Sequence, residues 1–384
     1  MNEVYLDNSS TTPPFKEVLD HMYHLQLSCY GNPSSLHYKG IEAEKSMENS
    51  RKIIASFLQA SPEELIFTSG GTEANNLAIK GLAYRHLRRG THLITTPIEH
   101  PSSLNAFQQL AQEGFRVSYV QLHPDGSVVL PHLLSLIDSQ TTLVSIIHVN
   151  NEIGTIQDLP KLAEAIKEKS SPPLVHFDGI QSLGKLPLLP HEHKIDALSL
   201  SAHKVHGPKG AGALWLKAGT KITPLFQGGD QEQRLRPGTE NTPGIAGFGH
   251  ALYCLNHQYQ HQGSRLSRLK HKFWELITSS VEVNLNGPEP SKGAPHILNL
   301  SFPGVKAEVL IRSLEQHRIY VSPGSACHSR HPEPSHVLTA LGHSRERIDE
   351  AVRFSFSVLN TEKEIEYAAE KVATTVKELR EFFL

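Results

Sequence analysis

A cysteine in an unusual loop is the first residue of the chain that could do chemistry. Cys327 lies in the segment 321–334, which is rich in small residues and prolines, with Arg330 and His331 close by. An exposed setting near positive charge favours the thiolate, which is the nucleophilic form of cysteine. The segment is therefore predicted to present a reactive thiol.

A lysine follows a predicted strand at 197–200, in the run Ser201-Ala202-His203-Lys204. A lysine with a lowered pKa forms Schiff bases with carbonyl compounds, and Ser201 and His203 could hold a phosphate. Most lysines are solvated surface residues, so the position alone leaves both interpretations open. A metal site at the neighbouring histidines is not indicated, because their spacing does not match the helical H-E-x-x-H pattern.

Two more motifs follow predicted strands. Asp178 ends the strand 174–177, where its carboxylate could pair with a cation or cap the next helix. Gly70 and Gly71 join the strand 65–68 to a helix that begins near Thr72. The free N–H groups of such a helix start can cradle a phosphate, although two glycines are also typical of an ordinary turn. Ligands of open α/β sheets bind beyond the carboxyl ends of the strands, so we expect these motifs to converge.

The elements that must position these motifs alternate along the chain. Strands are predicted at 65–68, 92–95, 115–120, 143–148, 174–177, 197–200 and 213–216. Helices are predicted at 41–58, 72–84, 102–112, 131–137 and 159–168. This alternation indicates βαβ units, and hence an α/β fold with a large, mostly parallel sheet covered on both faces.

The pattern changes after about residue 255. A polar helical stretch at 256–277 precedes a strand at 297–302, and a final helix begins at a capping box, Thr361 to Glu364. We predict a large domain at 14–255, and a smaller α/β domain at 1–13 and 256–384 that carries the 321–334 loop.

The composition limits the compartment and the kinds of contact that the protein can be expected to have. The chain has 384 residues, a formal net charge of -2 and three cysteines. An odd cysteine count argues for a reducing compartment, and Cys29 and Cys254, in helical-looking stretches, are expected to be inert. The N-terminus lacks the pattern of a signal peptide, and no apolar run could cross a bilayer. We expect a cytoplasmic protein without direct nucleic-acid or membrane contacts.

Taken together, the motifs resemble the cysteine desulfurases of the class V aminotransferase fold. The resemblance runs from Tyr5 to about Tyr367. It rests on residues 5–13, 31–35, 68–76, 99–100, 148–154, 178 with 181, 201–204, 236–241, 324–327 and 352–355. It implies a pyridoxal-phosphate-dependent transferase of the aspartate aminotransferase type (fold type I), with a large sheet domain and a smaller C-terminal domain.

The resemblance also implies how the cofactor is held. Lys204 is expected to form the Schiff base and to move the α-proton, and Asp178 to pair with the pyridinium nitrogen so that the ring acts as an electron sink. Gln181 is expected to hydrogen-bond the phenolic oxygen, and His100 to stack on the ring and assist proton transfer. The remaining expected cofactor residues are Gly71, Thr72, Asn150, Ser201, His203 and, from a partner subunit, Thr239. This last role implies a homodimer.

For the substrate, the resemblance implies that Arg353 binds the carboxylate of L-cysteine and that Asn150 and Asn32 orient it. Cys327 then attacks the substrate sulfur, which leaves alanine and a persulfide. The long loop around Cys327 resembles the branch that delivers sulfur to a scaffold protein of iron–sulfur cluster assembly or to a tRNA-thiolating enzyme. The loop of this chain, with Arg330 and His331, is more basic than is usual for that branch.

Two alternatives remain beside this interpretation. An aminotransferase or a β-lyase on the same scaffold would also use Lys204, Asp178 and His100, and the Cys327 loop is the feature that distinguishes a desulfurase from it. A non-catalytic sulfur carrier or scaffold would have lost Lys204, Asp178 or Cys327, and all three are present.

Overall fold

The computed structural model describes residues 3–259, 262–323 and 334–383. Its largest sheet has seven strands in the order β2-β8-β7-β6-β5-β3-β4. They are β2 (Leu65–Thr68), β3 (His92–Thr95), β4 (Arg116–Tyr119), β5 (Thr141–Ile147), β6 (Leu174–Asp178), β7 (Ala197–Ser201) and β8 (Gly212–Leu216). Strand β8 runs antiparallel to β2 and β7 on its two sides, and all other pairs of this sheet are parallel. The prediction of a mostly parallel α/β sheet is confirmed.

Helices cover both faces of this sheet because alternate residues of its strands are apolar on each side. On one face lie α3 (Gly71–Arg85) and α4 (Pro101–Gln112), which share a core with Ile66 and Leu214. On the other face lie α2 (Tyr38–Phe57), α6 (Leu159–Lys167) and α7 (Thr242–Gln258), which share a second core with Phe67 and Trp215. The helix α1 (Lys16–Ser28) packs on α7, and α5 (Leu130–Leu136) packs on α6.

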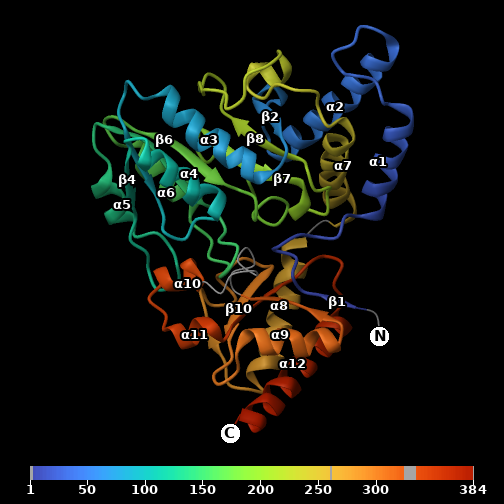
Figure 1. Ribbon diagram of the computed structural model, residues 1–384, viewed down its shortest axis with the longest axis vertical. Coiled ribbons are helices and arrows are strands. Elements are labelled where there is room, and N and C mark those ends of the chain that lie inside the picture. Colours follow the sequence, from blue (N-terminus) through green and yellow to red (C-terminus); the bar gives the residue numbers. More distant parts are fainter. Residues whose placement is uncertain (1–2, 260–261, 324–333, 384) are drawn as a thin grey trace.

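A second unit lies below the large sheet in Figure 1. Its antiparallel sheet has the order β12-β13-β10-β9, formed by β9 (Asn284–Leu285), β10 (Ile297–Ser301), β12 (Ser322–Pro323) and β13 (Ala351–Ser355). The N-terminal strand β1 (Val4–Tyr5) pairs with β11 (Ile319–Tyr320) in this unit. Its helices are α8 (Gln262–Thr278), α9 (Ala307–Gln316), α10 (His336–Ala340), α11 (Arg345–Asp349) and α12 (Glu362–Phe383).

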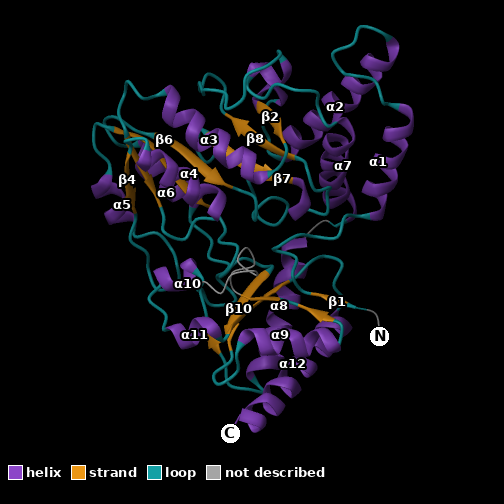
Figure 2. Cartoon of the chain, in the orientation of Figure 1, coloured by secondary structure: helices purple, strands orange, loops and turns teal. Residues whose placement is uncertain are grey.

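The second unit has its own core. Phe273 of α8 packs against Phe354 of β13, and Leu310 of α9 and Val372 of α12 belong to the same cluster. Figure 2 shows the two sheets as separate groups of strands with helices around each. Val4 and Leu6 belong to this second core, whereas Phe15 belongs to a core of the large unit. The division of the chain at residues 13 and 255 stays a prediction.

The predicted strands of the large sheet agree with the observed strands to within two residues at each end. The prediction of one helical stretch at 256–277 is wrong at its start. Residues 256–258 close α7, which packs on α1 and α2, and α8 begins at Gln262. These last residues of α7 are polar, so the sequence pattern did not indicate that they continue a helix whose earlier residues are largely apolar.

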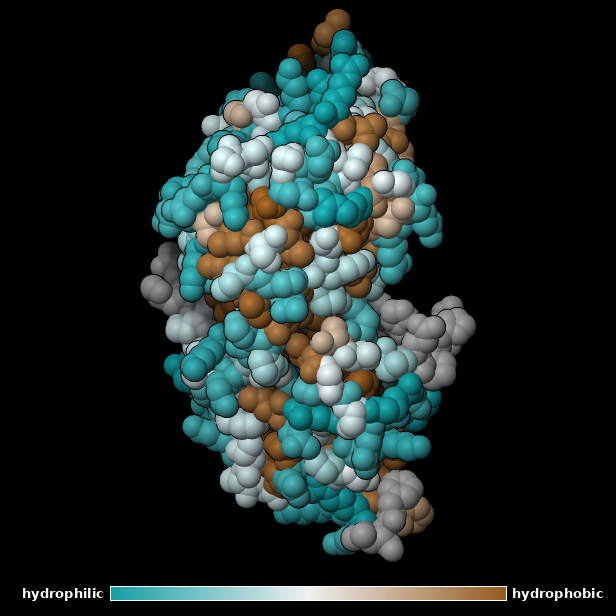
Figure 3. Space-filling model, turned by 90° about the vertical axis from the view of Figure 1, so that its left-hand side faces the viewer, coloured by the Kyte–Doolittle hydropathy of each residue, from teal (hydrophilic) through white to brown (hydrophobic). Residues whose placement is uncertain are grey.

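The surface is mixed in character. On the face that Figure 3 shows, hydrophilic residues predominate and hydrophobic ones form patches between them. Within the described ranges, the structure contains no helix that is both long enough and apolar enough to span a membrane.

Candidate active site

A cavity of about 640 Å³ lies where the carboxyl ends of the large-sheet strands face the second unit. Both units contribute to its walls. Its lining includes Gly71, Thr72, His100, Asp178, Gln181, Ser201, His203 and Lys204 from the large unit, and Asp7, Ser9, Ser10, Val321, Ser322, Pro323 and Arg353 from the other. The convergence of the motifs at one sheet edge follows from the parallel strands that carry them.

Lys204 ends a short helical turn directly after β7. Its ammonium group donates hydrogen bonds to the carbonyl oxygens of Ser9 and, at 2.7 Å, Ser10. The neighbouring Lys185 donates from Nζ to the carbonyl oxygen of Lys204 at 2.8 Å. Burial, and then the charge of Lys204, lowers the pKa of Lys185 to about 7. The N-terminal segment thus holds the Lys204 amine in the cavity, with a second lysine behind it.

Asp178 is the last residue of β6 and is buried. Its Oδ2 accepts from Asn75 Nδ2 at 2.7 Å, and its Oδ1 accepts from the backbone N–H of Ile180 at 3.0 Å. Burial raises the pKa of the Asp178 carboxyl group above its ordinary value. A buried carboxylate with only neutral donors is best stabilised by a cation in the cavity.

The histidines of the site are neutral. His100 caps α4 by accepting from the backbone N–H of Ser102, and burial followed by the Lys204 charge lowers its pKa to about 4. The same two causes lower the pKa of His203 to about 3, and its Nδ1 lies 3.2 Å from Thr11 Oγ1. Both rings therefore offer hydrogen bonds and a flat face instead of positive charge at neutral pH.

The start of α3 forms one corner of the cavity. Gly70 has φ of +151°, and no side chain of the described residues caps the helix. A Cβ on Gly71 would lie 2.2 Å from Cδ1 of Ile180, so a larger residue at this position would require the Ile180 side chain to move. The Ser201 hydroxyl, at the same cavity, is buried and has no hydrogen-bond partner in the described part of the chain. These groups form a place for an anion.

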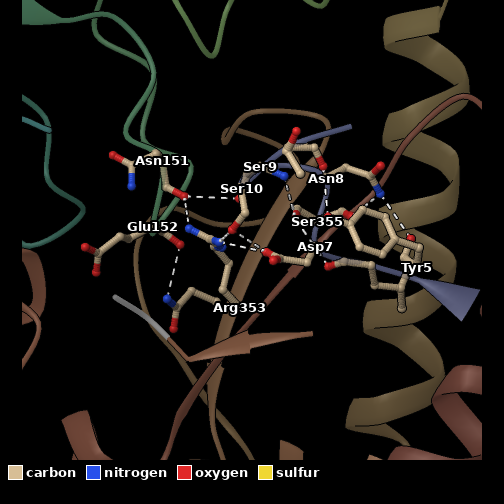
Figure 4. Close-up of polar contacts among 12 residues, drawn as sticks. Tyr5, Asp7, Asn8, Ser9, Ser10, Asn151, Glu152, Arg353 and Ser355 are labelled. Atoms are coloured by element: carbon tan, nitrogen blue, oxygen red, sulfur yellow. Dashed lines mark hydrogen bonds and ion pairs between the residues drawn. The ribbon is translucent and has the colours of Figure 1, made fainter. Parts of the chain in front are cut away.

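Arg353 comes from β13 and reaches the cavity from the opposite side. Its Nη1 donates to the carbonyl oxygen of Asn151 at 2.9 Å, and its Nη2 donates to Asp7 Oδ1 at 2.8 Å and to Ser10 Oγ at 2.7 Å (Figure 4). Its Nε is buried without an acceptor among the described residues. The guanidinium group is therefore fixed in direction, which suits recognition of a planar carboxylate.

The comparisons with known proteins agree with this geometry. The model of the aminotransferase class-V family matches residues 4–368. The cysteine desulfurase IscS of Clostridium botulinum strain Hall is 40% identical over 381 residues, which are 99% of this chain and 96% of the relative. The same-named protein of Azotobacter vinelandii is 40% identical over 383 residues, 98% of this chain and 94% of the relative.

This chain belongs to the class-V aminotransferase family and, within it, to the cysteine desulfurases. Solved structures agree. A NifS-like protein superposes with a TM-score of 0.92 at 36% identity, covering 98% of this chain and all of the other. SspA in complex with cysteine superposes with a TM-score of 0.80 at 35% identity, covering 92% and 99%.

Most residues predicted for a desulfurase site line the cavity, but Asn150 does not. Its side chain is buried and bonds only backbone groups in the described structure: Nδ2 donates to the carbonyl oxygen of Ile98, and Oδ1 accepts from the N–H groups of Glu152 and Ile153. Asn150 therefore shapes the turn after β5, and the residue of this turn that lines the cavity is Asn151. The sequence prediction named Asn150 and did not include its neighbour Asn151.

Two further predicted residues lie elsewhere on the described chain. Asn32 and Thr239 are exposed, and neither lines the cavity. Asn32 belongs to the loop between α1 and α2, at the top of Figure 1. Cys327 lies outside the described residues. The described positions on either side of it are close to the site: Pro323 lines the cavity, and Ser335 Oγ donates to Glu152.

Proposed function

We propose that this protein is a pyridoxal-phosphate-dependent cysteine desulfurase that converts L-cysteine to L-alanine and takes the sulfur onto Cys327 as a persulfide. One observation carries the proposal. Lys204, Asp178 and Arg353 line a single cavity in a chain of the desulfurase family, with an amine, a buried carboxylate and a guanidinium group on its different walls.

The residues present fit the cofactor. The buried Asp178 carboxylate, which has only neutral donors, suits the protonated ring nitrogen, and the start of α3 with the unpartnered Ser201 hydroxyl suits the phosphate. Thr72 and His203 complete the proposed phosphate site, and the flat ring of His100 faces the same cavity. When bound, pyridoxal phosphate supplies an electron sink for breaking bonds at an amino acid.

The side chains of the cavity would divide the work between binding and proton transfer. Arg353 binds the carboxylate of cysteine through its fixed guanidinium group, and Asn151 lies beside it. The Lys204 amine takes up and returns the substrate proton at its Nζ. Because the pKa of His100 is lowered to about 4, its ring is neutral at neutral pH. The ring can therefore take part in proton transfer during the reaction without carrying a permanent positive charge.

Sulfur transfer belongs to Cys327. Its thiolate forms a bond to the sulfur of L-cysteine while the bond between that sulfur and the β-carbon breaks. The electron pair of the broken carbon–sulfur bond stays on the β-carbon, which takes up the proton of the substrate thiol. The carbon skeleton leaves as alanine, and the sulfur remains on Cys327 as a persulfide. The proposed acceptor of this sulfur is a scaffold protein of iron–sulfur cluster assembly or a tRNA-thiolating enzyme in the reducing cytoplasm.

The test is the production of alanine and sulfide from L-cysteine with a thiol reductant. The wild-type protein should release both in equal amounts, and Cys327→Ser should release neither while still binding the cofactor. Cys254→Ser is the matched control, because Cys254 is buried in α7 and away from the cavity. Full activity in Cys327→Ser would replace the desulfurase proposal with a lyase that releases sulfide directly.

We also propose that the enzyme works as a homodimer in which Thr239 completes the phosphate site of the partner subunit. Thr239 is exposed in its own chain, and α1 with the loop after it exposes Tyr23, Leu27, Tyr30 and Leu36. Co-expressed Lys204→Ala and Thr239→Ala subunits should form mixed dimers with one intact site. If the co-expressed subunits are more active than either variant alone, this would support the arrangement. A monomeric mass in solution would refute it.

A further inference from the structure

A buried histidine of the second unit reaches the cofactor site through a glutamine. His296 directly precedes β10, and its ring is fully buried. Its Nε2 lies 3.3 Å from Oε1 of Gln181, a cavity residue of the large unit. The backbone at His296 is fixed, because its carbonyl oxygen accepts from the N–H of Phe356 at 2.9 Å. The contact therefore joins the two units at the site.

The protonation of this contact follows from its neighbours. Gln181 Nε2 lies 2.8 Å from the carbonyl oxygen of Ser9, which can only accept a hydrogen bond. The amide nitrogen must therefore face Ser9, and the amide oxygen must face His296. An amide oxygen also only accepts, so His296 must carry its proton on Nε2.

The other ring nitrogen agrees with this assignment. Nδ1 of His296 is buried and has no partner among the described residues, so a proton there would remain without an acceptor. Burial, and then the positive charges of Lys185, Lys270, Lys204 and Arg353, lower the pKa of His296 well below its ordinary value. The ring therefore remains neutral with its single proton on Nε2.

We propose that His296 is a positioning residue that locks the Gln181 amide in one orientation, so that an N–H of Gln181 is left to face the phenolic oxygen of the cofactor. Gln181 Nε2 has two hydrogens, and Ser9 takes one of them. Without the His296 donor, the amide oxygen loses its partner and the amide can rotate or move away. This inference rests on the proposed cofactor and goes beyond it by assigning a role to a residue that does not line the cavity.

The test is a pH titration of the absorbance of the cofactor-loaded enzyme. A donor to the phenolic oxygen favours its deprotonated form, so loss of that donor should raise the apparent pKa of the spectral change by about one pH unit. We expect this rise in His296→Leu, which removes the donor and fills the buried position with an apolar side chain. His296→Gln keeps an N–H and should titrate like the wild type. In a Gln181→Leu background, His296→Leu should add no further shift.

Each outcome decides the inference. A folded His296→Leu enzyme with the wild-type titration, or an equal shift in His296→Gln, overturns it. The unmodified holoenzyme gives a second test that needs no variant: ¹⁵N-histidine NMR should show a neutral His296 ring with its proton on Nε2, and a proton on Nδ1 would overturn the proposal. An enzyme that takes up no pyridoxal phosphate would instead refute the proposed function.

Discussion

Asp7 Oδ1 and Arg353 Nη2 form an ion pair of 2.8 Å that connects the N-terminal segment to β13 inside the cavity (Figure 4). The Arg353 side chain is 1% exposed and that of Asp7 is 21% exposed. The arginine is therefore the buried partner, and the aspartate is the more exposed one. Ser10 ties the pair together, since its hydroxyl donates to Asp7 Oδ1 at 2.8 Å and accepts from Arg353 Nη2.

This relationship makes Arg353 hard to replace. Arg353→Lys is expected to raise the KM for cysteine by roughly tenfold or more, because one ammonium group cannot bond Asn151, Asp7 and the substrate in the fork geometry of a guanidinium group. Arg380→Lys is the matched control, since Arg380 of α12 bonds only the carbonyl oxygens of Pro303 and Glu282 in the described structure. An unchanged KM in a folded Arg353→Lys enzyme would show that the carboxylate binds elsewhere.

Substitutions of the two adjacent asparagines should have different effects, one on activity and the other on stability. Asn151→Ala is expected to impair steady-state activity with little change in the melting temperature, because Asn151 lines the cavity. Asn150→Ala is expected to lower the free energy of unfolding by about 1–3 kcal/mol, because it leaves buried backbone groups of Ile98, Glu152 and Ile153 without partners. Thermal unfolding and steady-state kinetics on both variants check this, and the reverse pattern would contradict it.

The sequence was sufficient to predict the strands of the large sheet, because these strands are apolar on both faces and end in recognisable motifs. Leu65–Thr68 and His92–Thr95 are fully buried runs, and their bounds agree with the prediction. The helix α1 was not predicted, because it presents only one buried residue, Val18, and leaves Tyr23 and Leu27 exposed. A helix with a weak apolar stripe gives little periodic signal.

The site was predictable as a set of residue types but not as a set of contacts. Asp178 ends β6, and Lys204 and Gln181 lie shortly after strand ends, so their convergence follows from the parallel sheet. The bond between Arg353 and Asp7 joins residues 346 positions apart, and the contact of His296 with Gln181 joins residues 115 positions apart. Such pairs depend on how the two units pack, which no local pattern of residues contains.

Lys204 is expected to carry the cofactor covalently. Borohydride reduction of the wild-type holoenzyme should fix pyridoxal phosphate on the peptide that contains Lys204, and Lys204→Ala should lose both this adduct and desulfurase activity. Lys217→Ala, at an exposed position after β8, should keep both. Peptide mass spectrometry measures the adduct. An adduct on Lys185 in the wild-type enzyme, where that lysine has a pKa of about 7, would move the assignment to the second lysine.

Glu99 should make the folded protein less stable as pH rises from about 4.5 to about 8. Burial raises the pKa of its carboxyl group to about 8, and its Oε2 is buried without a partner among the described residues. Below about pH 4.5 this group is protonated in both the folded and unfolded states, so it adds no pH dependence. Between there and pH 8 only the unfolded state releases the proton, so rising pH favours unfolding, and the effect is complete above pH 8.

Glu99→Gln isolates this effect. Glutamine can still accept from Thr96 Oγ1 and the backbone N–H of Ile147, as Glu99 Oε1 does at 2.6 and 2.9 Å, but it cannot ionise. The difference in the urea concentration at the unfolding midpoint, variant minus wild type, should therefore increase as pH rises from about 5 to about 8.5. Glu164→Gln, at an exposed position in α6, should show no such trend. A constant difference between Glu99→Gln and the wild type would mean that Glu99 is already ionised at low pH in the folded protein.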